Sequence, residues 1–292
     1  MNHKTMKTII KFLLGFLLFV SIVSATYVRH YVYSVTVKVT DSLSVDEREV
    51  DLQAWLSYYT WLQENEVEIV SRRALPDTNA IEPIVWQLIK NKSSRMNKDV
   101  SLFTYQYIGY YDEFTYDSIV KAQKNKNLPN FSQIMMYPMT GLSYEQVNDF
   151  CEWRTEVVGE KKVEYRLPTP SEWTKIAKLG LKENEKTQGF CDSLNGKKPA
   201  FNYKWFNTAR YKYKESIPVS CIQPAANFSA NELKAWDLFG NVAEMTSKKG
   251  VAKGGSFNSY AKQCNADSVQ HYKKSEKWLG FRCVAVLIPQ DR

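Results

Sequence analysis

The sequence predicts a mixed α/β domain that is rich in loops. Three observations lead to this prediction: one stretch of alternating apolar residues, a few short segments with helical spacing and clear start signals, and long stretches without periodicity. The chain of 292 residues contains 18 tyrosines and 8 tryptophans, which suits a core of large rings with polar tips packed between loops. With 44% hydrophobic residues, the chain can bury a core of its own.

The first 25 residues have the pattern of a secretory signal. Lys4, Lys7 and Lys11 precede an apolar run over residues 12–23, which ends in small residues. We therefore expect an exported protein, located in the periplasm or at the cell surface. Because the uncharged run continues to residue 28, an uncleaved membrane anchor stays open as an alternative. This segment is the only membrane contact that the sequence predicts.

The net charge of +8 does not follow a nucleic-acid-binding pattern. Positive residues are scattered and mixed with acids, as in Asp46-Glu47-Arg48-Glu49. A phosphate backbone needs a basic stripe, and none is visible in the sequence. We therefore expect no nucleic-acid partner.

A strand and a helix are the first elements expected after the signal. Residues 33–39 alternate between apolar and polar side chains, which indicates a strand with one buried face. A helix should begin after Asp51, a favourable N-cap residue. Its apolar face is formed by Leu52, Trp55, Leu56, Tyr59 and Leu62. Residues 83–90 fit either a short helix or a buried strand, residues 104–111 an extended segment or loop, and residues 121–130 an exposed segment.

Two capping boxes predict the starts of two more helices. Ser143 is followed three residues later by Gln146, and Thr169 is followed by Glu172. Pro170 is at the first helical position, where proline is favoured. Later, residues 182–235 are irregular, and residues 278–286 indicate a core strand. No linker divides the chain, so we expect one domain over residues 34–290.

Residues 237–244 contain a pattern of possible cation ligands. Asp237, Asn241 and Glu244 supply side-chain oxygens at spacings of four and three residues. Gly240 permits a tight turn, which lets neighbouring carbonyl groups point inward. Ca²⁺ takes six to eight such oxygen ligands, although the same residues are also common in plain turns.

Five cysteines follow the signal segment: Cys151, Cys191, Cys221, Cys264 and Cys283. In an oxidising compartment, an odd count leaves at least one thiol unpaired or paired with another chain. Cys264 is either the partner of Cys191 or Cys221, or a free thiol beside a Cys191–Cys221 bridge. The sequence leaves both alternatives open.

Five motifs, taken in order, resemble the formylglycine-generating enzyme (sulfatase-modifying factor) superfamily. They are P-M-T-G-L-S-Y-E-Q-V-N-D-F-C-E-W-R, Y-R-L-P-T-P-S-E-W, D-L-F-G-N-V-A-E-M-T, K-G-G-S-F and L-G-F-R-C, within a resemblance that covers about residues 34–287. The G-N-V-A-E segment looks most similar to the gliding-motility and secretion-associated branch of Bacteroidetes. The resemblance implies an α/β, loop-rich fold related to C-type lectins, with little regular secondary structure.

The resemblance also implies a disulfide and a calcium site. Cys151 matches a family cysteine that is bridged to the one at Cys283. Such a bridge would stabilise the fold by roughly 4–5 kcal/mol on the loop-entropy estimate. The implied calcium ligands are the side chains of Asp237 and Glu244 and the carbonyl groups of Gly240 and Val242, with Asn241 orienting the loop.

The oxidase chemistry of the family requires two cysteines, three and eight residues after the serine of G-G-S. They bind Cu(I) as thiolates, which are the soft ligands that this ion prefers. Here the serine is Ser256, and the two positions hold Ser259 and Cys264, so one thiolate is missing. We therefore expect neither copper nor formylglycine-generating activity. An iron site of three histidines is also excluded, because only His30 and His271 follow the signal.

The missing thiolate and the lack of three histidines favour a pseudoenzyme that acts as a binding or scaffold domain of the cell envelope. Its expected partner is another envelope protein, for example in gliding-motility or secretion machinery. One alternative is an enzyme with altered chemistry in the same pocket, using Cys264. A second is a carbohydrate-binding protein, which rests on analogy with the lectin fold alone.

Overall fold

The computed structural model describes residues 35–90, 134–158, 162–179 and 222–288, except residues 84, 87, 88 and 229. The signal segment, residues 104–111 and 121–130, and two of the five cysteines lie outside the described residues. None of the described helices has the length and hydrophobicity needed to cross a membrane.

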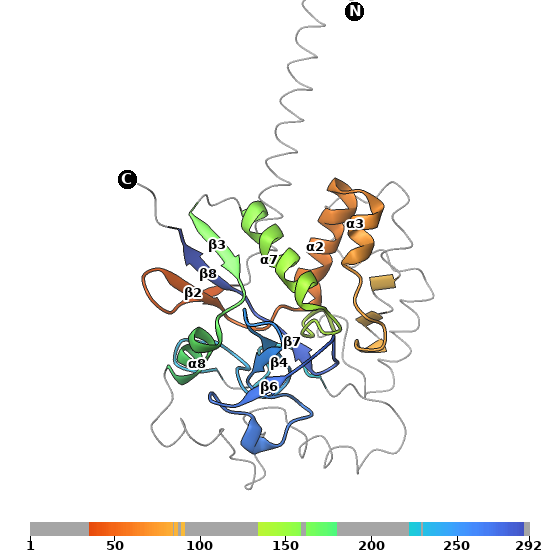
Figure 1. Ribbon diagram of the computed structural model, residues 1–292. Helices are drawn as coiled ribbons and strands as arrows, with labels where there is room; N and C mark the ends of the chain where they lie inside the picture. The colour runs from red at the N-terminus through yellow and green to blue at the C-terminus, as the bar shows by residue number, and fades with distance from the viewer. Residues whose placement is uncertain are drawn as a thin grey trace, which may run out of the picture.

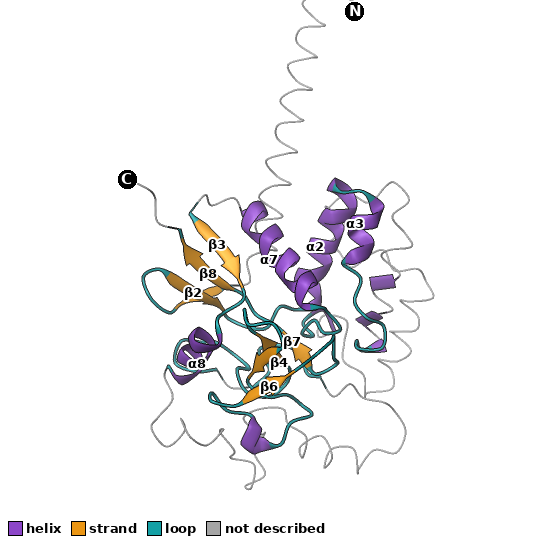
Figure 2. Ribbon diagram, in the orientation of Figure 1, coloured by secondary structure: helices purple, strands orange, loops and turns teal. Residues whose placement is uncertain are grey.

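Two small sheets of four strands each form the framework (Figure 2). The first sheet is antiparallel throughout, in the order β1 (Thr36–Lys38), β2 (Leu43–Asp46), β8 (Val284–Leu287) and β3 (Val163–Arg166). The second has the order β6 (Val269–His271), β5 (Val251–Lys253), β4 (Ala243–Met245) and β7 (Leu279–Gly280), with β4 and β7 parallel. The short strands and long connections confirm the mixed α/β, loop-rich prediction.

Besides helical residues within 83–90 and at 134–135, the described fold contains four helices and one short 3-10 turn. They are α2 (Leu52–Asn65), α3 (Glu68–Arg73), α7 (Tyr144–Val158), α8 (Pro170–Lys178) and the 3-10 turn η3 (Ala261–Gln263). Figure 1 shows α2, α3 and α7 grouped together, with α8 apart from them, and α8 contacts β5 of the second sheet.

The helix starts predicted from the sequence are confirmed. The Asp51 carboxylate accepts a hydrogen bond from the Ala54 N–H at 2.9 Å and caps α2. At α8, the Glu172 N–H donates to Thr169 Oγ1 at 3.1 Å, and the Thr169 N–H donates to Glu172 Oε2 at 2.8 Å. Before α7, Ser143 and Gln146 form the same reciprocal pair. Each box therefore satisfies donors that the helix leaves unpaired.

An aromatic cluster packs α2 against α7 and against the chain that follows β7. The rings of Trp55 and Phe150 stack with their centroids 5.6 Å apart, and Phe281 meets Phe150 edge to face at 5.4 Å. All three side chains are buried. Ring pairs of this geometry stabilise a core beyond the area they bury, which explains the high aromatic content.

Two expectations from the sequence are resolved by the fold. The described residues of 83–90 are helical, so the helix alternative is confirmed. The single strand predicted over residues 278–286 is wrong, because this segment forms β7 and β8 in different sheets. The chain crosses between the sheets at Arg282, whose side chain is fully buried. Because apolar residues flank Arg282 on both sides, the sequence alone did not indicate this crossing.

Candidate functional site

A buried arginine connects the two sheets next to the predicted cation loop. The Arg282 side chain donates to both carboxylate oxygens of Glu244, from Nε at 2.7 Å and from Nη2 at 2.5 Å. It also donates to the main-chain oxygens of Asp46 and Trp236, at 3.2 and 2.7 Å. Trp173 Nε1 donates to Glu244 Oε2 at 2.6 Å. Protein donors therefore already occupy both oxygens of Glu244.

Main-chain N–H groups satisfy the carboxylate of Asp237. Oδ1 accepts from the Phe228 N–H at 2.9 Å, and Oδ2 accepts from the Asn227 N–H at 3.1 Å. Burial raises the pKa of Asp237 to about 6, although these hydrogen bonds oppose the shift. The side chain thus holds the segment around residues 227–228 in place.

Asn241, expected to orient the loop, is buried and hydrogen-bonded through both polar atoms of its side chain. Its Oδ1 accepts from the Gln223 N–H at 3.0 Å, and its Nδ2 donates to the Gln223 oxygen at 3.1 Å. Its backbone φ is 54°, in the left-handed region that asparagine tolerates better than most residues. Asn241 therefore connects its own turn to the main chain at Gln223.

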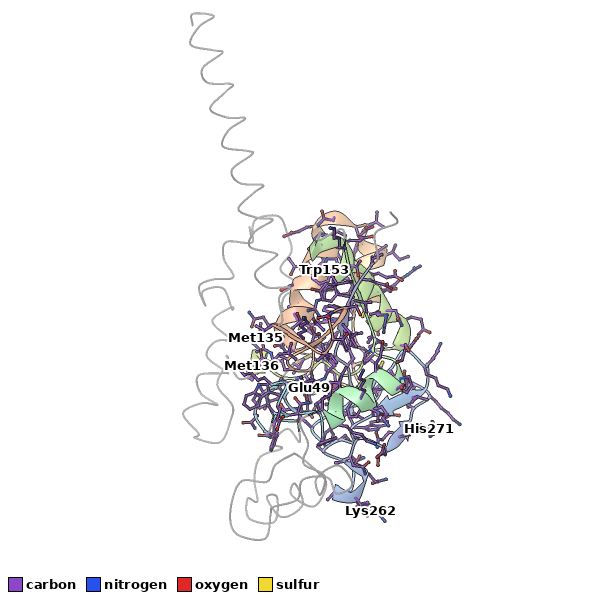
Figure 3. The ribbon with its side chains drawn as sticks, turned by 90° about the vertical axis from the view of Figure 1, so that its left-hand side faces the viewer. Glu49, Met135, Met136, Trp153, Lys262 and His271 are labelled. Atoms are coloured by element: carbon purple, nitrogen blue, oxygen red, sulfur yellow. The ribbon has the colours of Figure 1, made fainter. Side chains whose placement is uncertain are left out.

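Glu49 belongs to the same buried group, and sequence reasoning missed it. Its Oε1 accepts from Asn241 Nδ2 at 3.1 Å, whereas Oε2 has no hydrogen-bond partner among the described residues. Burial and the nearby Asp237 raise the pKa of Glu49 well above its usual range. Glu49, labelled in Figure 3, is buried. In the sequence it stands in a run of mixed charges, which looks like an exposed segment.

Protein donors occupy the carboxylates of the two acidic residues in the predicted calcium site. Glu244 is paired with Arg282, and Asp237 is bound to main-chain N–H groups. No group of three or more histidine, cysteine or acidic side chains that could hold a metal is found among the described residues. The calcium site of Asp237, Gly240, Val242 and Glu244 stays a prediction.

The family pocket positions lie in a closely packed turn. The Ser256 N–H donates to Ser259 Oγ at 3.0 Å, and the two hydroxyl oxygens are 3.3 Å apart. Ser256 is buried, and its Oγ accepts from the Asn258 N–H at 3.2 Å. Ser259, where the resemblance leads us to expect a cysteine, thus uses its hydroxyl group to close the turn.

Cys264 lies beneath the same turn and is fully buried. Its Sγ is 3.9 Å from the Ser256 oxygen and 3.7 Å from the Tyr260 oxygen. A Cβ atom at Gly255, where φ is 72°, would come within 2.7 Å of this sulfur, so only glycine fits there. Burial raises the pKa of Cys264 to about 12, which keeps it a neutral thiol at pH 7. Its candidate partners, Cys191 and Cys221, lie outside the described residues.

Cys151 and Cys283 meet in the core, as the resemblance implies. Both are buried, and their sulfurs are 3.5 Å apart across 132 positions of sequence. This separation is a contact between thiols, since bonded sulfurs are about 2.05 Å apart. The bridge between them stays a prediction.

Three solved structures resemble the chain at low sequence identity. PvdO from Pseudomonas aeruginosa is 12% identical, with a TM-score of 0.46 over 84% of this chain and 80% of its own. CarF is 16% identical, with a TM-score of 0.44 over 85% and 87%. Treponema denticola variable protein 1 is 14% identical, with a TM-score of 0.43 over 84% of each chain. No curated protein sequence matches the chain significantly.

The described chain thus has two short sheets joined by a buried arginine, and its G-N-V-A-E loop lies beside a G-G-S turn. The family described as "Sulfatase-modifying factor enzyme 1-like domain" matches residues 36–287. The chain therefore belongs to this family, and the assignment drawn from the five motifs is confirmed.

Proposed function

We propose that this protein is an exported, non-catalytic member of the family that serves as a binding or scaffold domain in the cell envelope. One observation carries the proposal: of the two positions that supply copper thiolates in the family, one holds Ser259, whose hydroxyl accepts a hydrogen bond from the Ser256 N–H. A neutral oxygen engaged in a turn is a poor ligand for a soft ion such as Cu(I).

The remaining thiol does not support altered chemistry in the same pocket. Nucleophilic and redox reactions of cysteine proceed through the thiolate, in a partly exposed and electropositive setting. Cys264 is fully buried and its pKa is raised by that burial. The non-catalytic function is therefore better supported than an enzyme that relies on Cys264 alone.

The envelope location rests on the N-terminal signal pattern. The basic start and the apolar run of residues 12–23 favour export, and the G-N-V-A-E segment favours the gliding-motility and secretion-associated branch. A protein partner in that machinery is part of the proposal. Proximity labelling in cells, followed by mass spectrometry, tests it. Labelled proteins confined to the cytoplasm would rule out the envelope role.

An assay for aldehyde formation tests the absence of oxidase chemistry. The purified chain is supplied with Cu(I), dioxygen and a sulfatase-type peptide that contains cysteine. We expect the peptide to keep its thiol, as measured by mass spectrometry. Catalytic conversion of the cysteine to an aldehyde overturns the proposal.

A copper competition assay tests the observation behind the proposal. Ser259→Cys restores the second sulfur, and we expect this variant to take Cu(I) from a chromogenic chelator more strongly than the natural chain. The double variant Ser259→Cys/Cys264→Ser is the matched control and should lose that gain. Equal Cu(I) binding by the natural chain and the Ser259→Cys variant would contradict the role given to Ser259.

A further inference from the structure

The outer face of α7 has a straight row of acids, here called the acidic stripe. It consists of Glu145, Asp149, Glu152 and Glu156, all exposed. Their spacing of four, three and four residues places them on one side of the helix, over about 16 Å. Among the described residues, only Glu145 makes an ion pair, and its partner is Lys249. Asp149 interacts electrostatically with Arg73, and within the described residues Asp149, Glu152 and Glu156 form no ion pair.

The second sheet has a group of exposed lysines, here called the basic surface. It consists of Lys248 and Lys249 in the β4–β5 turn, and Lys273, Lys274 and Lys277 between β6 and β7. The Tyr272 N–H donates to the Gly250 oxygen at 3.2 Å, which holds the two segments together. Asp77 and Glu276 reduce the charge of this surface but leave it positive. Within the described part of the chain, only Lys249 has an ion-pair partner.

The acidic stripe begins where the basic surface ends. The Tyr144 hydroxyl donates to the Ser247 oxygen at 2.7 Å, and Glu145 pairs with Lys249 next to this contact. From there α7 extends away from β4 and β7, as Figure 1 shows. Charges that are scattered in the sequence are therefore sorted in space into a negative half and a positive half. The two halves meet at the Glu145–Lys249 pair.

We propose that this two-part surface binds a second copy of this chain, arranged by a two-fold axis near the Glu145–Lys249 pair. A two-fold rotation exchanges the halves, so the acidic stripe of each copy faces the basic surface of the other. Each complementary contact then occurs twice. Apart from Glu145 and Lys249, which pair with each other, the charges involved make no ion pair among the described residues, so they can face a second copy.

A second copy suits the whole surface better than an anionic membrane does. A negatively charged bilayer attracts lysines, but it repels carboxylates. The carboxylates of the acidic stripe adjoin the basic surface at the Glu145–Lys249 pair. A second copy with the same pattern satisfies both halves. The inference does not depend on whether the pocket is catalytic, so it can fail while the proposed function holds.

Sedimentation of the full chain tests the proposal, with one mild detergent present throughout because of the apolar N-terminal segment. We expect a monomer–dimer equilibrium at about 50 mM salt that shifts to monomer at about 500 mM, because exposed charges are screened. A monomer at both salt concentrations overturns the proposal. A dimer that is insensitive to salt also overturns it, because apolar contacts would then hold the copies together.

Charge reversal locates the interface. Glu152→Lys/Glu156→Lys makes the stripe basic, and Lys273→Glu/Lys274→Glu makes the basic surface acidic. Each double variant alone should self-associate at least about tenfold more weakly, because like charges then face each other. Mixed in equal amounts, the two variants should form a mixed dimer. Failure of the mixture to associate contradicts the pairing.

A control variant with the same change in net charge tests whether added lysines weaken association in general. Glu164→Lys/Glu232→Lys changes the net charge by the same amount at two exposed positions outside both halves. This variant should dimerise like the natural chain. If it weakens association equally, the stripe is not the interface. If the natural chain stays monomeric but binds anionic vesicles through its lysines, the basic surface contacts membranes and the proposal is wrong.

Discussion

Arg282 is the side chain whose loss should destabilise the described fold most clearly. It makes two charged hydrogen bonds to Glu244 and two more to main-chain oxygens at Asp46 and Trp236. Arg282→Met keeps much of the side-chain volume but leaves the Glu244 carboxylate fully buried, with Trp173 as its remaining hydrogen-bond donor among those described here. Removing one partner of a buried ion pair costs about 3–5 kcal/mol.

Urea unfolding at pH 7, followed by tryptophan fluorescence, measures that cost. Arg72→Met is the matched control, because Arg72 pairs with Glu68 at a site where both side chains are mostly exposed. Surface pairs of this kind contribute less than about 1 kcal/mol. The expected contrast between the two variants is therefore at least about 2 kcal/mol in the free energy of unfolding.

A double variant separates the lost pair from general damage to the core. Glu244→Leu in the Arg282→Met background removes the stranded carboxylate, so part of the lost stability should return. Two results would show that the buried pair does not hold the sheets together. One is that Arg282→Met lowers the free energy of unfolding no more than the Arg72→Met control does. The other is that the losses in the free energy of unfolding from Arg282→Met and Glu244→Leu are additive. The reasoning would then be wrong.

Three further predictions concern neighbouring groups. The pKa of Glu49 is raised in the folded state, so the stability linked to its proton is lost as pH rises through that pKa. Glu49→Gln should therefore be more stable than the natural chain at about pH 8 and lose that advantage toward about pH 4 in urea unfolding. The hydrogen bonds of Arg282 to Glu244 can hold the loop without a cation, so a Tm that a calcium chelator leaves unchanged would contradict the predicted calcium site. A Tm that falls on chelation and recovers with added Ca²⁺ would instead support the calcium site. Under oxidising conditions Cys151 and Cys283 should be found bridged by non-reducing peptide mapping. Cys283→Ser should then cost about 4–5 kcal/mol, and two free thiols in the oxidised protein would refute the bridge.

Local structure was predictable from the sequence because its signals lie within a few residues. The reciprocal bonds of Thr169 with Glu172, and of Ser143 with Gln146, join residues three apart, so the pattern alone indicates a helix start. The family was also predictable, because five motifs in a fixed order rarely occur together by chance. These signals gave the helix starts and the class of fold.

Long-range pairing was not predictable from the same information. Arg282 reaches the Asp46 oxygen across 236 positions, and Asn241 reaches Glu49 across 192. Nothing near Glu49 in the sequence distinguishes a buried acid from an exposed one. The division of residues 278–286 between two sheets was missed for a related reason, because the buried charge at Arg282 is explained only by its distant partner.

The most direct test of the proposed loss of oxidase chemistry is the aldehyde assay on the natural chain with Cu(I) and dioxygen. The packed turn of Ser256 and Ser259, with a buried neutral thiol beneath it, predicts that the cysteine of the peptide substrate is recovered unchanged. Aldehyde formation by the natural chain that disappears in Cys264→Ser would contradict this prediction and restore the protein to the catalytic members of its family.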